Sequence, residues 1–229
     1  MDYCPGGDLS LHLKREKRFN EHKARCYICE VILAIEELHK HNVIYRDLKP
    51  DNLVVDKRGN TRLCDFGLSK LNVNDEENTH SFWGSVAYLP PEILNKSGHG
   101  KAVDWYLIGA LLYEFLIGHP PYYAKSKEAI FKNIRSAPLP FPPNISPEAK
   151  DFIKKLLNRN PAKRLVDPEV IKSHSFFADV DWKCVYHKLV RMPKNTKIRY
   201  ALAQYDTDNF EDSIETSDRV GEWSFNNKL

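Results

Sequence analysis

Two short segments, VIYRDLKPDN at residues 43–52 and LCDFG at residues 63–67, decide which fold this sequence specifies. Between them, residues 53–55 and 61–64 are short apolar or β-branched runs, and a polar turn containing Gly59 separates them. Such a pattern predicts a two-stranded β-hairpin. Because a hairpin reverses the chain, it would bring Asp65 back beside Asn52, so that both side chains face one site.

The residues around this hairpin fit the needs of phosphoryl transfer. That reaction requires an oriented hydroxyl, a divalent cation on the phosphates and neutralisation of the developing charge. Asp47 could accept the hydroxyl proton and Lys49 could neutralise phosphate charge, while Asn52 and Asp65 supply the oxygen ligands that magnesium prefers. Asn52 follows Asp47 at the spacing of a kinase catalytic loop. Either segment alone is more often an ordinary turn, but both in order around one hairpin favour an active site.

Further motifs make the sequence similar to a known family. Tyr45 precedes Arg-Asp, GSVAYLPPE occupies residues 84–92, DWYLIG residues 104–109 and NPAKR residues 160–164. HSFFADVDW at residues 174–182 and YDTDNF at residues 205–210 follow. With these motifs the chain resembles the C-terminal lobe and tail of a eukaryotic protein serine/threonine kinase. It is most similar to the AGC group, which includes the cyclic-nucleotide-dependent kinases.

The expected fold is mainly α with a small β-hairpin, a kinase-like C-lobe of an α+β fold that lacks its N-terminal β-lobe. The pattern predicts one helical run over residues 9–41, a buried helix over 103–117 and a helix that starts at Ser146 and stops at Asn160. Residues 72–79 read as a flexible loop, and the sequence becomes irregular after residue 181. The expected division is a hinge remnant at 1–8, the C-lobe at 9–177 and an AGC-type C-terminal extension at 178–229.

The resemblance implies roles for individual residues in catalysis. Asp47 would be the catalytic base, Lys49 would contact the transferring phosphate, and Asn52 and Asp65 would hold Mg²⁺. ATP would contact the cofactor-binding set, namely Asp2, Cys4, Asp8, Asp51, Val54 and Asp65. Phe66 and Tyr45 would stack in the hydrophobic interior. Asp104 would anchor the catalytic loop, and Glu92 would form a buried ion pair with Arg164.

Regulation and substrate choice also follow from the resemblance. Ser81, with Thr79 as an alternative, stands where the group carries an activating phosphate, which an upstream kinase would add and Arg46 and Lys70 would bind. Substrate-binding acids are expected at Asp8, Asp51 and Glu114, which would favour protein substrates with basic residues near the Ser/Thr acceptor. Val86 and Leu89 would line the pocket for the residue after the acceptor. Taken singly, Ser81 reads as an ordinary loop serine, and each of the three acids reads as a solvated surface residue.

The sequence departs from the family in several places. Ser85 replaces the usual Thr, Val86-Ala87 replaces Pro-Glu, and Pro90 replaces Ala. No G-x-G-x-x-G and no Val-Ala-Ile-Lys strand lies upstream of the catalytic loop, although kinases use these to hold the ATP phosphates. We therefore expect a truncated catalytic domain that is inactive alone. The alternative is a non-catalytic C-lobe that binds substrates or another kinase.

The composition argues against several kinds of partner and site. A net charge of +3 over 229 residues is too small to indicate nucleic acid, and no apolar run reaches the length of a membrane span. Five cysteines, an odd number with irregular spacing, argue against a disulfide framework. Cys26 and Cys29 form a C-x-x-C, but they lie in a helical run without a second ligand pair, which favours buried thiols over zinc or redox chemistry. No secretory signal is evident, so a cytoplasmic setting is expected.

Overall fold

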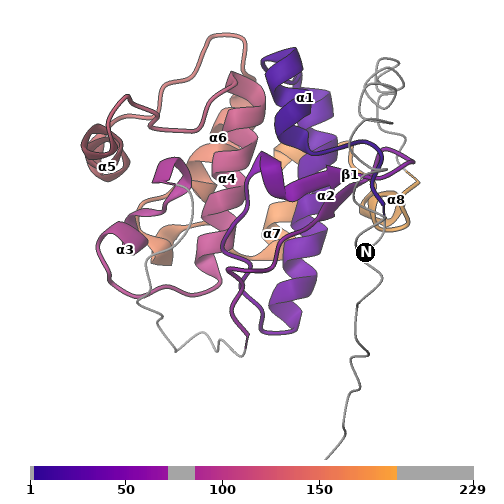
Figure 1. The fold of residues 1–229 in the computed structure, drawn as a ribbon, viewed down its shortest axis with the longest axis horizontal. Coiled ribbons are helices and arrows are strands. Elements are labelled where there is room, and N and C mark those ends of the chain that lie inside the picture. Colours follow the sequence, from indigo (N-terminus) through magenta and orange to yellow (C-terminus); the bar gives the residue numbers. More distant parts are fainter. Residues whose placement is uncertain (1–2, 72–85, 190–229) are drawn as a thin grey trace, which may run out of the picture. The chain divides into compact units, whose positions relative to one another are not determined.

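The computed structural model describes residues 3–71 and 86–189, which belong to one compact unit. Helices dominate it, and its sheet has two strands (Figure 1). The predicted fold class, mainly α with a small hairpin, is thus confirmed. In order, the elements are α1 (Leu9–Glu16), α2 (Glu21–Lys40), η1 (Pro50–Asn52), β1 (Leu53–Val55), β2 (Thr61–Leu63), η2 (Val86–Tyr88), α3 (Pro91–Leu94), α4 (Ala102–Ile117), α5 (Lys127–Ser136), α6 (Pro147–Leu156), η3 (Pro161–Lys163), α7 (Pro168–Lys172), η4 (Ser175–Phe177) and α8 (Trp182–Tyr186).

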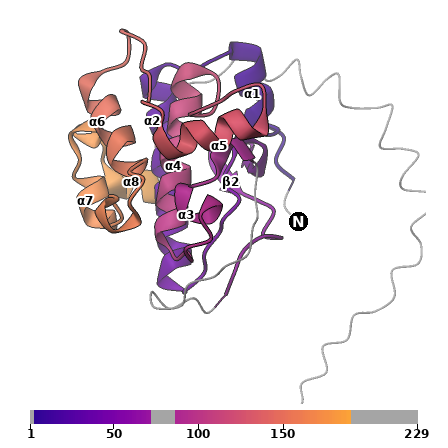
Figure 2. The same cartoon turned by 90° about the vertical axis from the view of Figure 1, so that its left-hand side faces the viewer.

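Helix α4 is the centre of the helical body. Nearly all of its side chains are buried, and it packs against α2 and α6 (Figures 1 and 2). Gly109 allows the close approach of α6, because a Cβ at this position would lie 2.8 Å from Cβ of Leu156. The sequence prediction of a buried helix over 103–117 is confirmed within one residue.

The prediction of one helical run over residues 9–41 is wrong, because the run is divided between α1 and α2. Lys17 ends α1 with a positive φ of 65°, and the Asn20 side chain caps α2 by accepting from the Lys23 amide at 2.8 Å. Between them, the Phe19 amide donates to the Phe115 carbonyl at 2.7 Å. The break therefore joins this corner to the end of α4, a long-range contact that periodicity does not reveal.

The hairpin forms as predicted, with Leu53 opposite Leu63 and Val55 opposite Thr61. Its turn is closed by the Asp56 carboxylate, which accepts from the amides of Arg58 and Asn60. Strand β1 is also bonded on its other side, since Gly6 donates to Val55 and Val55 donates to Gly7, both at 2.9 Å. The first described segment is thereby fixed beside the hairpin.

The remaining helices surround this frame. Ser146 caps α6 as predicted, but the helix ends at Leu156, before the expected stop. Helix α8, which the sequence did not predict, packs on α2 and buries Val185, and the Trp182 indole donates to the Lys172 carbonyl. Within residues 3–71 and 86–189, no helix is both long and apolar enough to cross a membrane.

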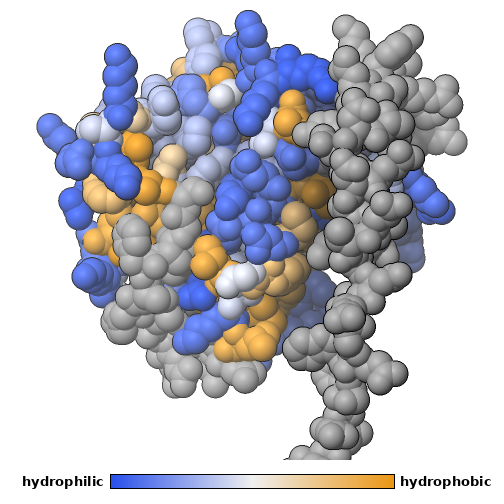
Figure 3. Space-filling view, viewed as in Figure 1, coloured by the Kyte–Doolittle hydropathy of each residue, from blue (hydrophilic) through white to orange (hydrophobic). Residues whose placement is uncertain are grey.

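The surface shown in Figure 3 is largely hydrophilic, with hydrophobic side chains emerging in separate places. The described residues include all five cysteines, and none of them forms a disulfide. Cys29 is buried and Cys26 is half-buried. Among the described residues, no group of three or more His, Cys, Asp or Glu side chains could hold a metal ion.

Candidate active site

The loop between α2 and β1 brings Asp47, Lys49 and Asn52 together. The Asp47 carboxylate accepts from the Lys49 ammonium at 2.7 Å and from the Asn52 amide at 2.8 Å. The same Asn52 nitrogen donates to the Asp47 carbonyl at 2.9 Å. Pro50 starts the single turn η1 and thereby folds Asn52 back onto Asp47. A nearly buried carboxylate is thus held between a cation and an amide.

Asp104 of α4 supports this loop from the core. Its side chain has no exposed surface, and it accepts from the backbone amides of Tyr45 at 2.9 Å and Arg46 at 2.8 Å. The His39 ring donates its Nε2–H to the same carboxylate at 2.8 Å. Two successive amides can point at one carboxylate because Arg46 adopts a positive φ of 71°. The loop backbone is therefore fixed by Asp104, which lies on α4, 57 positions after Asp47 in the sequence.

The hairpin places Asp65 beside the loop that contains Asp47 and Asn52. Asp65 follows β2 with a positive φ of 58° and accepts from the Gly67 amide at 3.1 Å. The preceding residue is tied to the loop twice, because the Cys64 amide donates to the Asn52 carbonyl at 3.0 Å and the Tyr45 hydroxyl donates to the Cys64 carbonyl at 2.5 Å. Asn52 and Asp65, the predicted metal ligands, thus belong to adjoining segments.

The donor chemistry at Asn52 and Asp65 fits magnesium. Because Nδ2 of Asn52 faces Asp47, its Oδ1 is left as an oxygen donor. One carboxylate and one amide oxygen are few ligands, but Mg²⁺ typically keeps several waters and binds substrate phosphates as well.

Tyr45 and Phe66 lie edge to face with ring centroids 5.4 Å apart. Tyr45 is fully buried, and burial raises the pKa of its hydroxyl. Phe66, by contrast, is 49% exposed. The expected stacking pair is present, but only Tyr45 belongs to the interior of the described residues.

The residues predicted to contact the nucleotide lie near the start of the chain and on β1. Asp8 forms a β-bridge with Val54 and caps α1 by accepting from Leu11 at 2.9 Å and from Ser10 at 2.6 Å. Cys4 precedes the turn that leads to this bridge and is half-buried. Asp2 lies outside the described residues. The structure therefore brings Asp8 and Val54 together, and Asp8 also stabilises the first turn of α1.

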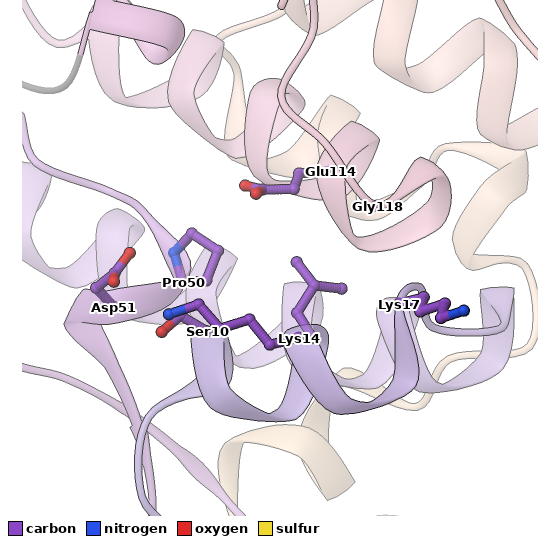
Figure 4. A pocket seen from close by; sticks show the side chains of 8 residues that line it. Ser10, Lys14, Lys17, Pro50, Asp51, Glu114 and Gly118 are labelled. Carbon is purple, nitrogen blue, oxygen red and sulfur yellow. The ribbon is translucent and has the colours of Figure 1, made fainter.

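Two of the three predicted substrate-binding acids share a cavity. Asp51 and Glu114 line a space of about 390 Å³ together with Ser10, Leu13, Lys14, Lys17, Pro50 and Gly118 (Figure 4). Asp8 does not line this cavity, although it is bonded to Ser10. Burial, followed by the charge of Asp51, raises the pKa of Glu114 to about 7.

The other predicted peptide-facing residues differ in exposure. Val86 is half-buried and packs against the small cluster of Tyr122, Ile130 and Ile134. Leu89 is 1% exposed and belongs to the main core. In the described residues, only Val86 of this pair offers surface to a ligand.

Glu92 and Arg164 form a bidentate ion pair in the interior. The two nitrogen–oxygen distances are 2.6 and 2.9 Å, and both side chains are almost completely buried. Arg164 also donates to the carbonyls of Ala102 and Asn158 and lies over the Tyr106 ring. The pair thus connects α3 with α4 and the segment after α6.

The predicted phosphate-binding cations lie near each other, whereas Ser81 and Thr79 are outside the described residues. Lys70 pairs with Ile44 in a β-bridge, and the Arg46 side chain donates to the Leu68 carbonyl. His99 is buried close to both cations. Burial, followed by the charge of Arg46, lowers the pKa of His99 to about 4. Lys70 acts in the same direction, whereas Glu92 and Asp104 act in the opposite one. No sequence motif had singled out this histidine.

A comparison with known proteins identifies the family. Residues 1–177 match the model of the protein kinase domain. The chain belongs to the protein kinase family. Its relatives include the ribosomal protein S6 kinase beta of Caenorhabditis elegans, 43% identical over 197 residues, and the serine/threonine-protein kinase gad8 of Schizosaccharomyces pombe, 45% identical over 213 residues. The RAC family serine/threonine-protein kinase homolog of Dictyostelium discoideum is 41% identical over 229 residues.

These matches cover most of this kinase chain but only part of each relative. They span 84%, 92% and 99% of the chain, and 36%, 37% and 51% of the respective relatives. The resemblance to serine/threonine kinases of the AGC group is confirmed. The family implies protein substrates, and protein kinases in general use ATP and Mg²⁺.

Proposed function

We propose that this chain provides the catalytic-loop half of a serine/threonine kinase that transfers the γ-phosphate of ATP to basic peptides. The cluster of Asp47, Lys49 and Asn52, fixed by Asp104, is the observation that supports this proposal. The substrate hydroxyl oxygen would bond to the γ-phosphorus while the bond from that phosphorus to the β–γ bridging oxygen breaks. Asp47 would orient the hydroxyl and take its proton. Lys49 would neutralise charge on the transferring group.

Asn52 and Asp65 would hold Mg²⁺, which would neutralise the charge of the phosphates. Cys4, Asp8 and Val54 would border the nucleotide, with Asp2 as a further contact. The proposed division of the chain remains a hinge segment at 1–8, a lobe at 9–177 and an extension at 178–229. Arg46 and Lys70 would bind a phosphate placed on Ser81 by an upstream kinase.

Specificity for basic peptides is proposed for Asp51 and Glu114, which line the same cavity, with Asp8 near its rim through Ser10. Two carboxylates can face one guanidinium, whose planar fork of donors suits such a site. Val86 would border the pocket for the residue after the acceptor, and the buried Leu89 would support that pocket from the core.

A chimaera tests the catalytic proposal. The N-terminal lobe of an active protein kinase, which carries the glycine-rich loop, would be joined to this chain, and the chimaera would be assayed with an arginine-rich serine peptide. Asp47→Asn is expected to reduce the rate by at least about 10²–10⁴-fold, the usual effect of losing a general base. Asp179→Asn, a change at an exposed acid, serves as the matched control. If the chimaera with Asp47→Asn kept its full rate, Asp47 would not be the base.

A further inference from the structure

The cavity between α1, η1 and α4 contains an unusual carboxylate. Figure 4 shows Glu114 projecting from α4 into this space, with Asp51 across from it, Lys14 on α1 and Lys17 directly after α1. Oε2 of Glu114 is fully buried and has no hydrogen-bond partner among the described residues. A buried carboxylate oxygen without a partner is costly when it is charged. Protonation or a bound cation would remove this cost.

Burial, followed by the charge of Asp51, favours the neutral form of Glu114 when the cavity is empty. Asp51 repels a second negative charge, and the other charged groups that line the cavity are Lys14 and Lys17. Neither lysine is bonded to Oε2 in the described part of the chain. Burial and Asp51 together raise the pKa of Glu114 to about 7, so that near neutrality the side chain is divided between its two forms.

We propose that an arginine side chain entering between Asp51 and Glu114 displaces a proton from Glu114, so that selection of basic peptides strengthens as the pH rises through neutrality. This inference rests on the proposed function of the cavity. In this step the neutral carboxyl group of Glu114 releases its proton to solvent, and the resulting carboxylate pairs with the guanidinium cation of the peptide. Arginine suits it because its guanidinium keeps its charge at any pH a protein encounters, and a nearby cation favours the carboxylate form.

The pH dependence has a definite sign. Because the carboxylate form binds arginine, affinity should be lowest when Glu114 is protonated and should approach a plateau above pH 7. A single proton with this titration midpoint predicts about a tenfold increase in affinity from pH 6 to pH 8. Over the same range, a peptide with glutamine in place of arginine should show no such increase.

Isothermal titration calorimetry of the 229-residue chain tests the coupling. An arginine-rich serine peptide would be titrated at pH 6, 7 and 8 in buffers of different ionisation enthalpy, which reports the protons released. We expect about half a proton per peptide at pH 7. Glu114→Gln should abolish the release and flatten the pH dependence, whereas Glu128→Gln, at an exposed position on α5, should change neither.

Different results would contradict the proton coupling alone, or the basic-peptide site as well. Arginine-dependent binding with no proton release, and with the same pH profile in the wild type and Glu114→Gln, would overturn the coupling but retain the basic-peptide site. Equal affinity for the arginine and glutamine peptides at every pH, or no binding of either, would overturn both. Proton release that disappears in Glu114→Gln but not in Glu128→Gln would establish the coupling.

Discussion

Single residues set the pH response of this kinase chain, and His99 is an example. It is buried next to Arg46 and Lys70, and its pKa is lowered to about 4. In the unfolded chain a histidine titrates near pH 6.5, so the unfolded state binds more protons between these values. His99 therefore stabilises the fold above about pH 6.5, and this stability is lost as the pH falls toward 4.

Replacing this side chain should reduce the sensitivity to acid. Between pH 7 and pH 5, His99→Gln is expected to lose less thermal stability than the wild type, by about 4–7 °C in Tm. Calorimetric or circular-dichroism melts at the two pH values measure the difference. His119→Gln, at an exposed position, is the control. An equal loss of Tm in the wild type and His99→Gln would show that His99 does not govern acid sensitivity.

At the scale of elements, the close packing of α4 on α6 depends on Gly109. A Cβ there would lie 2.8 Å from Leu156 and 3.1 Å from Leu157. Gly109→Ala should therefore cost about 1–3 kcal/mol from overpacking, which exceeds the gain of up to about 1 kcal/mol in helix propensity. Urea unfolding measures the net loss. Gly100→Ala, where no atom lies within 4 Å of the added Cβ, should be nearly neutral. Similar losses in both variants would contradict this account.

Some elements of the fold could be predicted from local sequence signals, whereas others depend on distant contacts. The hairpin and the buried helix α4 were predictable because turn residues and apolar runs are local signals. The local spacing in VIYRDLKPDN likewise predicted that Asp47 and Asn52 lie together. The division between α1 and α2 was missed: the Asn20 cap is a local signal, but the contact of Phe19 with Phe115 depends on a residue far along the chain. The burial of Glu114 and His99 is a property of tertiary packing for the same reason.

At the scale of the whole molecule, the 229 residues contain a catalytic loop but no glycine-rich loop. We expect this chain alone to bind Mg-ATP more weakly than about 1 mM, because half of the usual phosphate contacts are lacking. We also expect no peptide phosphorylation above background. Equilibrium dialysis and a radiolabel transfer assay measure the two quantities. Robust phosphorylation of an arginine-rich peptide that Asp47→Asn abolishes would overturn this prediction.

The link between Asp104 and the catalytic loop has a consequence for how the molecule opens. The amides of Tyr45 and Arg46 donate to a carboxylate that lies inside the hydrophobic body. Releasing them would leave that charge buried with fewer partners, which is strongly unfavourable. Their hydrogens should therefore exchange with deuterium only in the large openings that expose α4. Although it has no regular secondary structure, this part of the loop then belongs to the slowest-exchanging cooperative unit of the molecule.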